Sequence, residues 1–575
     1  MKPGKKLLAL AVAAALMVSS MAGCATGGSG DSTASGSAAS TASTARKSGE
    51  VKQFKAFFAV PGTEINDDNE VQKKITDLIG AKCKETWLTG QSAKEAIGTL
   101  IAGGEYPDFV DGSDATRSLV DAGAFIQLDN YIDKYPNIKK YFTEEQWDAI
   151  KNANGGHIYY LPQFSVTNGK PTNTIHNDEA FWIQTRVLKW ANYPKITTMD
   201  QYFDLIEKYL KANPTMKSGT KNIGYTILCD DWRYFCLENA PQFLDGYPND
   251  GSCIVDPKTL KVIDYNTTPT AKTYFQKLNT EYKKGIVDPE SFTQKYDQYI
   301  SKLSTGAVLG MIDQYWDFSN NVNAALKTQK LDAEGCEYVP LPITIKEGVK
   351  NQWHTTQNVT NVAGGVGITT SCKDVEGALQ FINDLLSPEV VSLRAWGVKD
   401  TDYNVGTDGM FTRTQAMRDK ANDTTYKASH FCSYSYFPNF KGQILDNKNA
   451  ATPAEQISEF QSGLSQNLKE CFKAYNAKTY VDMLGDNETP GAWYPIYTFS
   501  DTLSAEDEAK VAWTKMADVK HQWLPKVCMA DSFDSEWNSY MTAYKATNAA
   551  VYMTKAEEAV KNRVEAAKKY ETSSK

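Results

Sequence analysis

Apolar and polar positions follow two different periods in the first part of the chain. A strand is predicted at the apolar run Phe54–Val60 and a second near Lys82–Trp87, and a turn at Glu105–Val110 leads into a third. Helical spacing separates them, over Val71–Ile79 and about Ala93–Ala102. This strand–helix–strand–helix–strand order predicts parallel strands joined by right-handed crossovers, as in a doubly wound sheet.

A second strand–helix unit lies late in the chain, within Val362–Tyr403. The apolar run Val362–Ile368 contains three glycines, which let another backbone approach closely, as in a buried strand. A helix with one apolar face follows, and Ser387-Pro388 ends it because the residue before proline avoids the α conformation. The residues of that face are Val375, Ala378, Leu379, Ile382, Leu385 and Leu386.

The remaining parts of the chain are mostly helical in their spacing. The run Lys302–Ile312 should pass from a helix end into a buried strand. A charged tail follows Thr554. Further helices are expected over Phe181–Trp190, Gln201–Lys211, Ala271–Lys284, Ala454–Ala474 and Glu506–Lys520.

The order of these units resembles the extracellular solute-binding proteins. The resemblance lies in GGVGITTS, EGALQFINDLLSPE and AWGVKDTDYNV of the late unit, in GGEYPDFV near residue 105, and in Gly155–Pro162, GGHIYYLP. The group most similar is the large oligosaccharide-binding lipoproteins of Gram-positive bacteria that serve ABC importers, some of them aldouronate binders. The resemblance implies an α/β fold of the type II periplasmic-binding-protein kind. Each lobe would be a mostly parallel sheet flanked by helices, with extra C-terminal helices.

The N-terminus has the features of a lipoprotein signal peptide. Three lysines precede the apolar run Leu7–Val18, which has signal-peptide length, and Met21-Ala22-Gly23-Cys24 resembles a bacterial lipobox. We therefore predict a signal peptide at 1–24, lipidation of Cys24 and a flexible Ser/Ala/Gly tether at 25–49. The predicted first lobe is 50–165 plus 363–403, and the predicted second lobe is 166–362 plus 404–575.

Composition narrows the class of protein. A chain of 575 residues exceeds one compact core, which agrees with two lobes. The formal net charge of -8 and the absence of Lys/Arg clusters argue against nucleic-acid binding. The cysteines are odd in number once Cys24 is lipidated and loosely spaced, which predicts buried free thiols. A disulfide between Cys229 and Cys236 or Cys253 is the alternative.

Motifs for catalysis and metal binding are missing from the sequence. There is no GxSxG, HExxH or P-loop, and the five histidines are scattered. Asp230-Asp231 is the one pair that could serve as glycosidase carboxylates, although solvated loop residues are the simpler interpretation. Pro248–Ser252 offers too few alternating oxygens for calcium. We expect no catalytic residues, no metal and no cofactor.

Aromatic and polar residues follow several predicted strands, and open α/β sheets bind ligands at these carboxyl ends. Sugars stack their C–H faces on Trp or Tyr while polar side chains bond their hydroxyls. Arg233 could meet a uronate carboxylate or make a surface salt bridge, and any single tryptophan here could instead pack in the core. The predicted ligand-contact residues are Glu64, Asp111, Gln163, Trp232, Arg233, Asp313, Trp316 and Trp353.

The sequence and the resemblance together predict a lipid-anchored, monomeric substrate-binding component of an ABC importer. It would sit on the extracellular face of the cytoplasmic membrane, contact the membrane only through its lipid, close two lobes on an oligosaccharide and deliver it to permease subunits. One alternative is a secreted carbohydrate-active enzyme. Others are a binder of peptides or another solute on the same scaffold, and a glycan-capture protein without a transporter.

Overall fold

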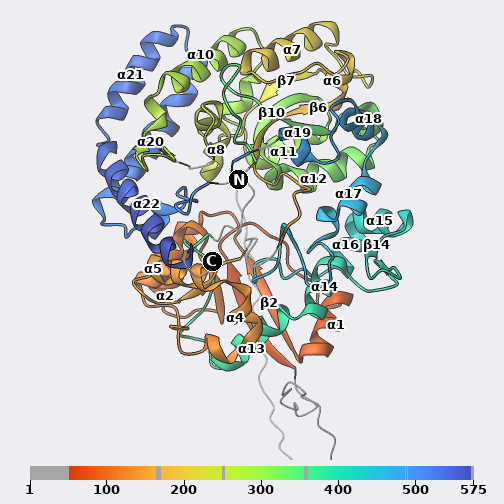
Figure 1. Ribbon diagram of the computed structural model, residues 1–575, viewed down its shortest axis with the longest axis vertical. Coiled ribbons are helices and arrows are strands. Elements are labelled where there is room, and N and C mark those ends of the chain that lie inside the picture. Colours follow the sequence, from red (N-terminus) through yellow and green to blue (C-terminus); the bar gives the residue numbers. More distant parts are fainter. Residues whose placement is uncertain are drawn as a thin grey trace, which may run out of the picture. The chain divides into compact units, whose positions relative to one another are not determined.

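The structure is a computed structural model that describes residues 51–163, 170–248, 251, 253–354, 361–485, 487–488 and 490–571. The chain divides into two units, residues 1–50 and residues 51–575, and the second unit carries the fold described below (Figure 1). The predicted signal peptide, Cys24 and the tether lie outside the described residues.

The first lobe is built on a five-stranded sheet of order β2-β1-β3-β12-β4. Strand β1 pairs in parallel with β2 and β3, as predicted, but β12 runs antiparallel to both β3 and β4. The sheet is therefore mixed, because β12, the strand that returns from the other lobe, runs opposite to the other four. Its strands are β1 (Lys52–Phe58), β2 (Ala81–Trp87), β3 (Phe109–Asp111), β4 (Tyr160–Leu161) and β12 (Val366–Ile368).

Helices cover this sheet and begin where the sequence supplies caps. Ser92 and Glu95 form a capping box at the start of α2, and Asp374 caps α13 by accepting from the amide of Gly377. The helices of the first lobe are α1 (Glu70–Ile79), α2 (Ala93–Gly103), α3 (Thr116–Asp121), α4 (Pro136–Tyr141), α5 (Glu144–Ala153), α13 (Val375–Leu385) and α14 (Pro388–Trp396).

The second lobe has its own apolar core around a four-stranded sheet of order β11-β6-β10-β7. Strand β10 is parallel to β7 and antiparallel to β6, and β6 is antiparallel to β11, so this sheet is also mixed. The strands are β6 (Glu179–Gln184), β7 (Ile223–Thr226), β10 (Val308–Gln314) and β11 (Tyr338–Leu341).

The predicted helix over Phe181–Trp190 is wrong in its first part. Residues Glu179–Gln184 form β6, and only Thr185–Trp190 is helical, as α6. All six residues of β6 are buried between two neighbouring strands. A fully buried strand shows no alternation of apolar and polar residues, so periodicity could not distinguish it from a buried helix.

Helices and short strands surround the second sheet. Those of residues 199–328 are α7 (Met199–Ala212), α8 (Phe235–Glu238), α9 (Ala240–Leu244), β8 (Ile254–Val255), β9 (Val262–Ile263), α10 (Pro269–Lys283), α11 (Tyr296–Ser304) and α12 (Tyr315–Thr328). Later ones are α17 (Ile457–Gly463), α18 (Gln466–Ala474), α19 (Tyr480–Leu484), α20 (Glu508–Met529), α21 (Phe533–Lys545) and α22 (Ala549–Glu571). Figure 1 shows α20 and α21, in blue, beside α10, and α22 packed against α20.

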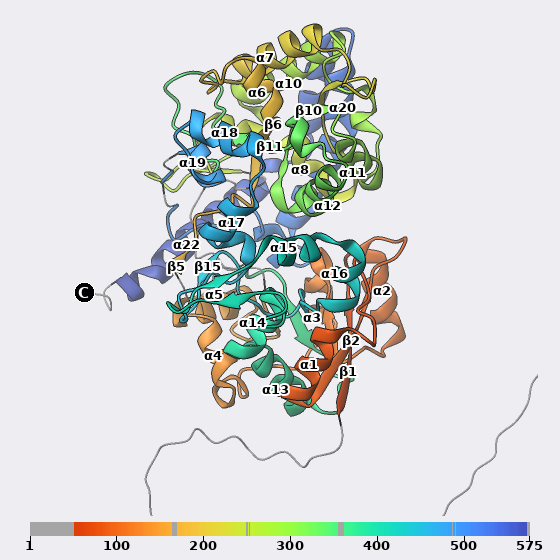
Figure 2. The same ribbon diagram turned by 90° about the vertical axis from the view of Figure 1, so that its right-hand side faces the viewer.

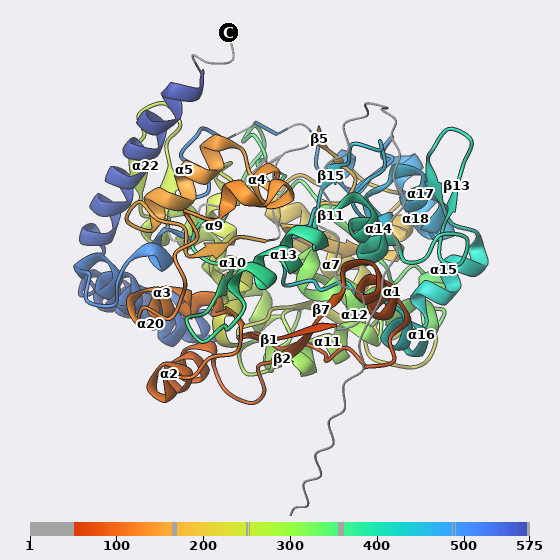
Figure 3. The ribbon, with the colours of Figure 1, turned by 90° about the horizontal axis from the view of Figure 1, so that it is seen from below.

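The segment after residue 403 returns in part to the first lobe, unlike the predicted boundary. Helix α16 (Thr424–His430) lies beside α1 (Figure 3). Cys432, Tyr434 and Phe437 belong to the same core as β1 and β2, and the hydroxyl of Tyr434 accepts from the amide of Cys83 at 3.3 Å. Before α16 come β13 (Asn404–Val405), β14 (Phe411–Thr412) and α15 (Gln415–Asn422).

Two crossing segments pair with each other. Strand β5 (Lys170–Pro171) is antiparallel to β15 (Gln443–Ile444), as Figure 2 shows. All nine cysteines of the described residues are buried and none forms a disulfide, which confirms the predicted buried thiols and contradicts the alternative, a disulfide from Cys229. Across the residues that the structure describes, we find no helix with the length and apolar character needed to cross a membrane.

Candidate ligand-binding site

Two exposed tryptophans of the second lobe meet where adjacent parallel strands end. Strand β10 runs directly into α12, whose second residue is Trp316. Strand β7 is followed by the 3-10 turn η3 (Asp231–Tyr234), which carries Trp232. Because β7 and β10 are parallel neighbours, their carboxyl ends lie at one edge of the sheet. The sheet therefore brings together two residues that are distant in the sequence.

The two indole rings stack on each other with an offset. Their centroids are 5.7 Å apart and their planes differ by 10°, an offset stack. Trp232 is 46% exposed and Trp316 is 36% exposed, although large aromatic side chains usually bury most of their area. A third ring between them would need two van der Waals spacings, about 7–8 Å in all. A ligand would therefore not insert between the two rings, and it would contact the surface of the pair that stays exposed.

Arg233 packs between the aromatic rings of Trp232 and Tyr296 and pairs with Asp317. Its guanidinium carbon is 4.3 Å from the ring centroid of Trp232 and 4.0 Å from that of Tyr296. Its Nε donates to Oδ1 of Asp317 at 2.9 Å, and the Asp317 side chain is 1% exposed. The predicted surface salt bridge is thus a buried one.

Asp313 lies beneath the pair and does not reach the surface. It is fully buried in β10 and accepts from the hydroxyl of Tyr299 at 2.7 Å and from the thiol of Cys236 at 3.3 Å. Burial raises the pKa of Asp313 well above its ordinary value, and the charge of Asp317 raises it further. This placement supports a role in packing the strand end and does not support ligand contact.

In the first lobe, Asp111 and Gln163 pair at the end of β3. The side-chain amide of Gln163 donates to Asp111, which also accepts from the amide of Ser113 at 2.8 Å. Burial raises the pKa of Asp111, and these two hydrogen bonds partly offset the rise. Glu64 is exposed in the loop after β1.

Trp353 is accounted for by core packing. It is 1% exposed, stacks on Phe243 with centroids 4.1 Å apart, and donates from Nε1 to the carbonyl of Ile343 at 2.7 Å. The structure therefore brings together Trp232, Arg233 and Trp316 in one lobe and Asp111 and Gln163 in the other. Asp111 and Gln163 are only 5% and 6% exposed, and Asp313 and Trp353 lie still deeper, at 0% and 1%.

Two first-lobe aromatics belong to the candidate site but were not among the predicted contacts. The register of the sheet places Trp87 and Asp111 on either side of Phe58 at the carboxyl ends of their strands. Trp87 and Tyr436 meet edge to face, with centroids 5.2 Å apart. A Cβ at Gly62 would lie 2.1 Å from the Trp87 ring, so only glycine allows the loop after β1 to rest on it. The rule that selected Glu64 could have found Trp87.

Electrostatic contacts connect the two lobes across this site. The pKa of Tyr436 is raised by burial and by the Asp111 carboxylate and lowered by Arg233, so Tyr436 faces charged groups of both lobes. Burial also raises the pKa of Asp114 in the first lobe, and Asp501 and Asp231 of the second lobe raise it further. Helix α3 of the first lobe also packs beside the 3-10 turn η8 (Phe499–Thr502) of the second, so these segments of the two lobes adjoin a common region.

The site has the composition of a binding site for a hydroxylated ligand. It offers aromatic faces, carboxylates and an amide, the groups that stack on and hydrogen-bond a polar ring. Asp230, the proposed glycosidase carboxylate, forms an ion pair with Lys295 at 2.8 Å and accepts from the amide of Tyr296 at 3.0 Å. Within the described parts of the chain, no three His, Cys, Asp or Glu residues are grouped to hold a metal.

Comparison with protein families identifies the class. Residues 86–403, more than half of the chain, match the family of bacterial extracellular solute-binding proteins. The chain belongs to this family, as the order of its sequence motifs predicted.

Solved structures with the same fold include binding proteins from several sources. FusA of S. pneumoniae, determined with kestose, has a TM-score of 0.63 and 17% identity, with 89% of this chain and 99% of that chain covered. An HMO-binding protein from Bifidobacterium longum infantis has a TM-score of 0.60 and 14% identity, with 88% and 98% covered. The alginate-binding protein AlgQ2 has a TM-score of 0.60 and 14% identity, with 89% and 98% covered.

These similarities establish the two-lobed α/β fold. A comparison with curated proteins gave no match.

Proposed function

We propose that this protein is the substrate-binding component of an ABC importer and that its ligand is an oligosaccharide. The stacked, exposed pair Trp232–Trp316 at the sheet edge carries the proposal, since such a surface fits the C–H face of a sugar ring. The similar structures are described as binding alginate, HMO, kestose or N-glycans, which supports the same ligand class. Binding in this proposal is the whole function, without catalysis.

The first lobe would supply the second half of the site. Asp111 and Gln163 would hydrogen-bond hydroxyl groups, and Trp87 with Tyr436 would cover another part of the ligand. Glu64 stays in the proposal as an exposed group of the same strand-end loops. The crossing segments, among them β5 and β15, would bend as the lobes close on the ligand, and the closed form would meet the permease.

We also propose that the protein acts as a monomer held to the extracellular face of the membrane by a lipid on Cys24. The 25-residue Ser/Ala/Gly segment would act as a tether of about 25–30 Å root-mean-square length. Replacing Cys24 by alanine should move the protein from the membrane fraction to the medium. Retention of this variant at the membrane through another contact would contradict the anchor.

The experiment that tests the ligand class is a thermal-shift screen of residues 51–575, which form one compact unit. Defined oligosaccharides are added, and the ligand is recovered and sized afterwards. A ligand at 100 times its dissociation constant adds about 2.7 kcal/mol to stability. A clear rise with intact ligand is the expected result, and the double variant Trp232→Ala/Trp316→Ala should abolish it.

Two results would replace the proposal. Shortened ligand after incubation would indicate a secreted carbohydrate-active enzyme, and Asp230→Asn and Asp231→Asn variants would then be assayed for loss of cleavage. No rise with any oligosaccharide, but a rise with peptides, would assign the same fold to a different solute.

A further inference from the structure

We propose that Arg233 is a positioning residue that holds the Trp232 ring parallel to Trp316 and does not itself contact ligand. The inference deepens the proposed function, because it concerns how the stacking surface is kept in shape. It differs from the expectation that Arg233 meets a carboxylate of the ligand.

The guanidinium of Arg233 has little surface left for a ligand. Its planar group is near the rings of both Trp232 and Tyr296, at 4.3 and 4.0 Å from their centroids. Its Nε is occupied by Asp317, and the side chain as a whole is 12% exposed. An arginine that recognises an anionic ligand normally presents its paired N–H groups outward, in a fork.

The ion pair of Arg233 joins the two segments that carry the tryptophans. Arg233 follows Trp232 in η3, and Asp317 follows Trp316 in α12. These segments are 84 residues apart in sequence and are connected here by a bond of 2.9 Å whose acceptor is buried. A displacement of η3 relative to α12 would break this pair, so the pair fixes the spacing of the two indoles.

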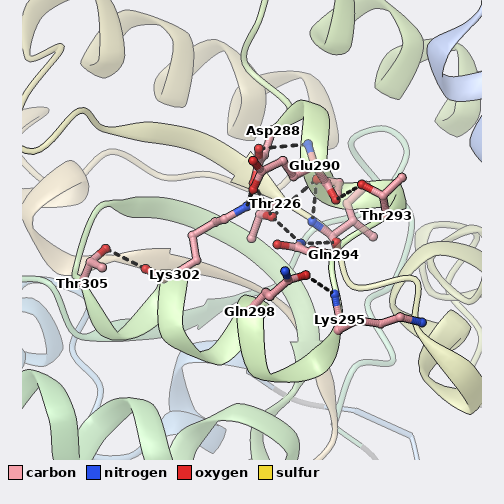
Figure 4. Close-up of polar contacts among 11 residues, drawn as sticks. Thr226, Asp288, Glu290, Thr293, Gln294, Lys295, Gln298, Lys302 and Thr305 are labelled. Atoms are coloured by element: carbon pink, nitrogen blue, oxygen red, sulfur yellow. Dashed lines mark hydrogen bonds and ion pairs between the residues drawn. The ribbon is translucent and has the colours of Figure 1, made fainter. Parts of the chain in front are cut away.

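The other ring, Tyr296, is itself firmly held. Its hydroxyl donates to the carbonyl of Asp317 at 2.7 Å, and its amide donates to Asp230 at 3.0 Å. Figure 4 shows polar contacts of the residues before and after Tyr296 in the chain, among them the ion pair of Lys302 with Asp288 at 2.5 Å. In the same view the side chain of Gln294 donates to the hydroxyl of Thr226 at 2.9 Å, at the end of β7. These hydrogen bonds hold Tyr296 in place, so its ring restricts the position of the Arg233 guanidinium.

Trp232 depends on this support more than Trp316 does. It lies in a 3-10 turn of four residues without a side-chain cap, and the residue before it, Asp231, has a φ of 52°. Besides Trp316 and Arg233, its ring neighbour is Phe235, at 5.9 Å. Trp316, by contrast, starts a helix of 14 residues and donates to Gln314. Without Arg233, the Trp232 side chain could populate other rotamers.

The test uses the near-ultraviolet circular dichroism of ligand-free residues 51–575. Two indoles in van der Waals contact couple their transitions, so the part of the signal lost in Trp316→Phe measures the pair. We expect Arg233→Met to lose most of this part and Arg233→Lys to keep more of it, because lysine retains the charge opposite Asp317. Oligosaccharide affinity should fall about tenfold in Arg233→Met.

A second variant distinguishes the loss of ring positioning from a general loss of folding. Arg233→Met leaves Asp317 buried without its partner, which is costly, whereas Arg233→Met/Asp317→Asn leaves no such charge. The double variant should melt near the wild-type temperature and still lack the coupled signal. An unchanged coupled signal in both variants would overturn the proposal, and a loss of affinity alongside that unchanged signal would assign Arg233 to ligand contact.

The spectroscopic result does not depend on the ligand class. If no oligosaccharide binds, the proposed function fails but the coupled signal still reports whether Arg233 holds the pair. If oligosaccharides bind and the signal is insensitive to Arg233, the proposed function stands and this inference fails.

Discussion

Each lobe presents two aromatic residues at the site, Trp232 and Trp316 in the second lobe and Trp87 and Tyr436 in the first. One arginine supports each pair, but the two arginines make different kinds of contact. In the second lobe, Arg233 packs on rings and bonds one carboxylate. In the first lobe, Arg394 is 5% exposed and bonds five backbone carbonyl groups, four of them in the turn that carries Tyr436. The carbonyls belong to Leu385, Ser433, Tyr434, Phe437 and Pro438.

The two kinds of contact predict different consequences of substitution, because Arg394 supports the fold and Arg233 supports the shape of the binding surface. Arg394 donates to all five of these carbonyls, two of which also accept from other groups, Tyr434 from the amide of Phe437 and Phe437 from the side chain of Asn439. Because buried carbonyls need donors, Arg394 is part of the folding of the first lobe. Arg233 acts on side chains that stay exposed, so it influences the shape of the surface with less influence on the fold. We expect substitutions in the first lobe to reduce stability first and substitutions in the second lobe to reduce binding first.

The largest expected effect is that of Arg394→Met. The change removes the donors of five buried carbonyl bonds and should lower the free energy of unfolding by about 4 kcal/mol. Denaturant unfolding followed by fluorescence measures it. The matched control is Arg117→Met, whose ion pair with Asp121 is partly exposed and worth less than about 1 kcal/mol. Equal losses in the two variants would show that the five carbonyl bonds of Arg394 contribute no more to stability than a partly exposed ion pair does.

The next effect concerns pH, and it comes from Glu85, which is 4% exposed in β2. Burial raises the pKa of Glu85 to about 8, and the nearby Arg394 lowers it in part. Between its ordinary pKa and about 8, the folded state holds a proton that the unfolded state has lost. Its contribution to stability is therefore full at low pH and is lost as the pH rises toward 8.

Glu85→Gln should remove this dependence, since the amide keeps the shape and does not ionise. The difference in unfolding free energy between wild type and variant should change by about 1.4 kcal/mol per pH unit, or about 3 kcal/mol over two units. Chemical denaturation at pH 5.5, 6.5 and 7.5 measures it. Parallel curves for the two proteins would show that Glu85 stays ionised in the folded state.

Trp316→Ala should change the free energy of unfolding less than the two variants above. Among these single substitutions it should reduce ligand affinity most. Loss of a central aromatic contact costs about 2 kcal/mol of binding free energy, about thirtyfold in affinity. Because the ring is 36% exposed, stability should fall far less than in a core variant. Isothermal titration with the oligosaccharide found in the screen measures it, with the exposed Trp190→Ala as the control. Unchanged affinity in Trp316→Ala would remove the pair from the site.

The sequence predicted the secondary structure and the site residues that depend on local hydrophobic periodicity or on closeness to a strand end. The parallel start of the first sheet and helices such as α7 followed from periodicity. The choice of Trp232 and Trp316 as candidates followed from the rule that ligand residues lie after strands, because both are close to their strand ends, but their stacking on each other was not predicted. Trp353 could not be separated from them, since a tryptophan before a crossing has no sequence signal for burial.

The parts that could not be predicted depend on long-range contacts. Tyr436 is placed by Arg394, 42 residues earlier in the chain, and nothing in the sequence near either residue indicates that pairing. The return of Cys432, Tyr434 and Phe437 to the first core is likewise decided by contacts with β2 and α1, such as the bond from Gln72 to the Tyr434 hydroxyl. The hydrophobic pattern of a segment predicts its secondary structure, but tertiary packing decides which lobe the segment joins.

The smallest expected effect is that of Tyr436→Phe, and it tests whether the first lobe takes part in binding at all. The ring is packed on Phe58 and Trp87, with centroids 5.2 Å away in each case, so the fold should tolerate the loss of the hydroxyl. One hydrogen bond to a ligand contributes about 1 kcal/mol, so affinity should fall about fivefold with an unchanged melting temperature.

Tyr436→Ala is the variant that makes this small effect interpretable. If the hydroxyl binds ligand, Tyr436→Phe and Tyr436→Ala should both lose affinity, and the alanine variant should also lose stability because Trp87 loses its neighbour. If only the alanine variant loses affinity, the ring contacts the ligand and the hydroxyl does not. If neither loses affinity, the first-lobe aromatics serve packing alone. Ligand recognition would then rest on the second-lobe tryptophans, with Asp111 and Gln163 as the first lobe's remaining contribution.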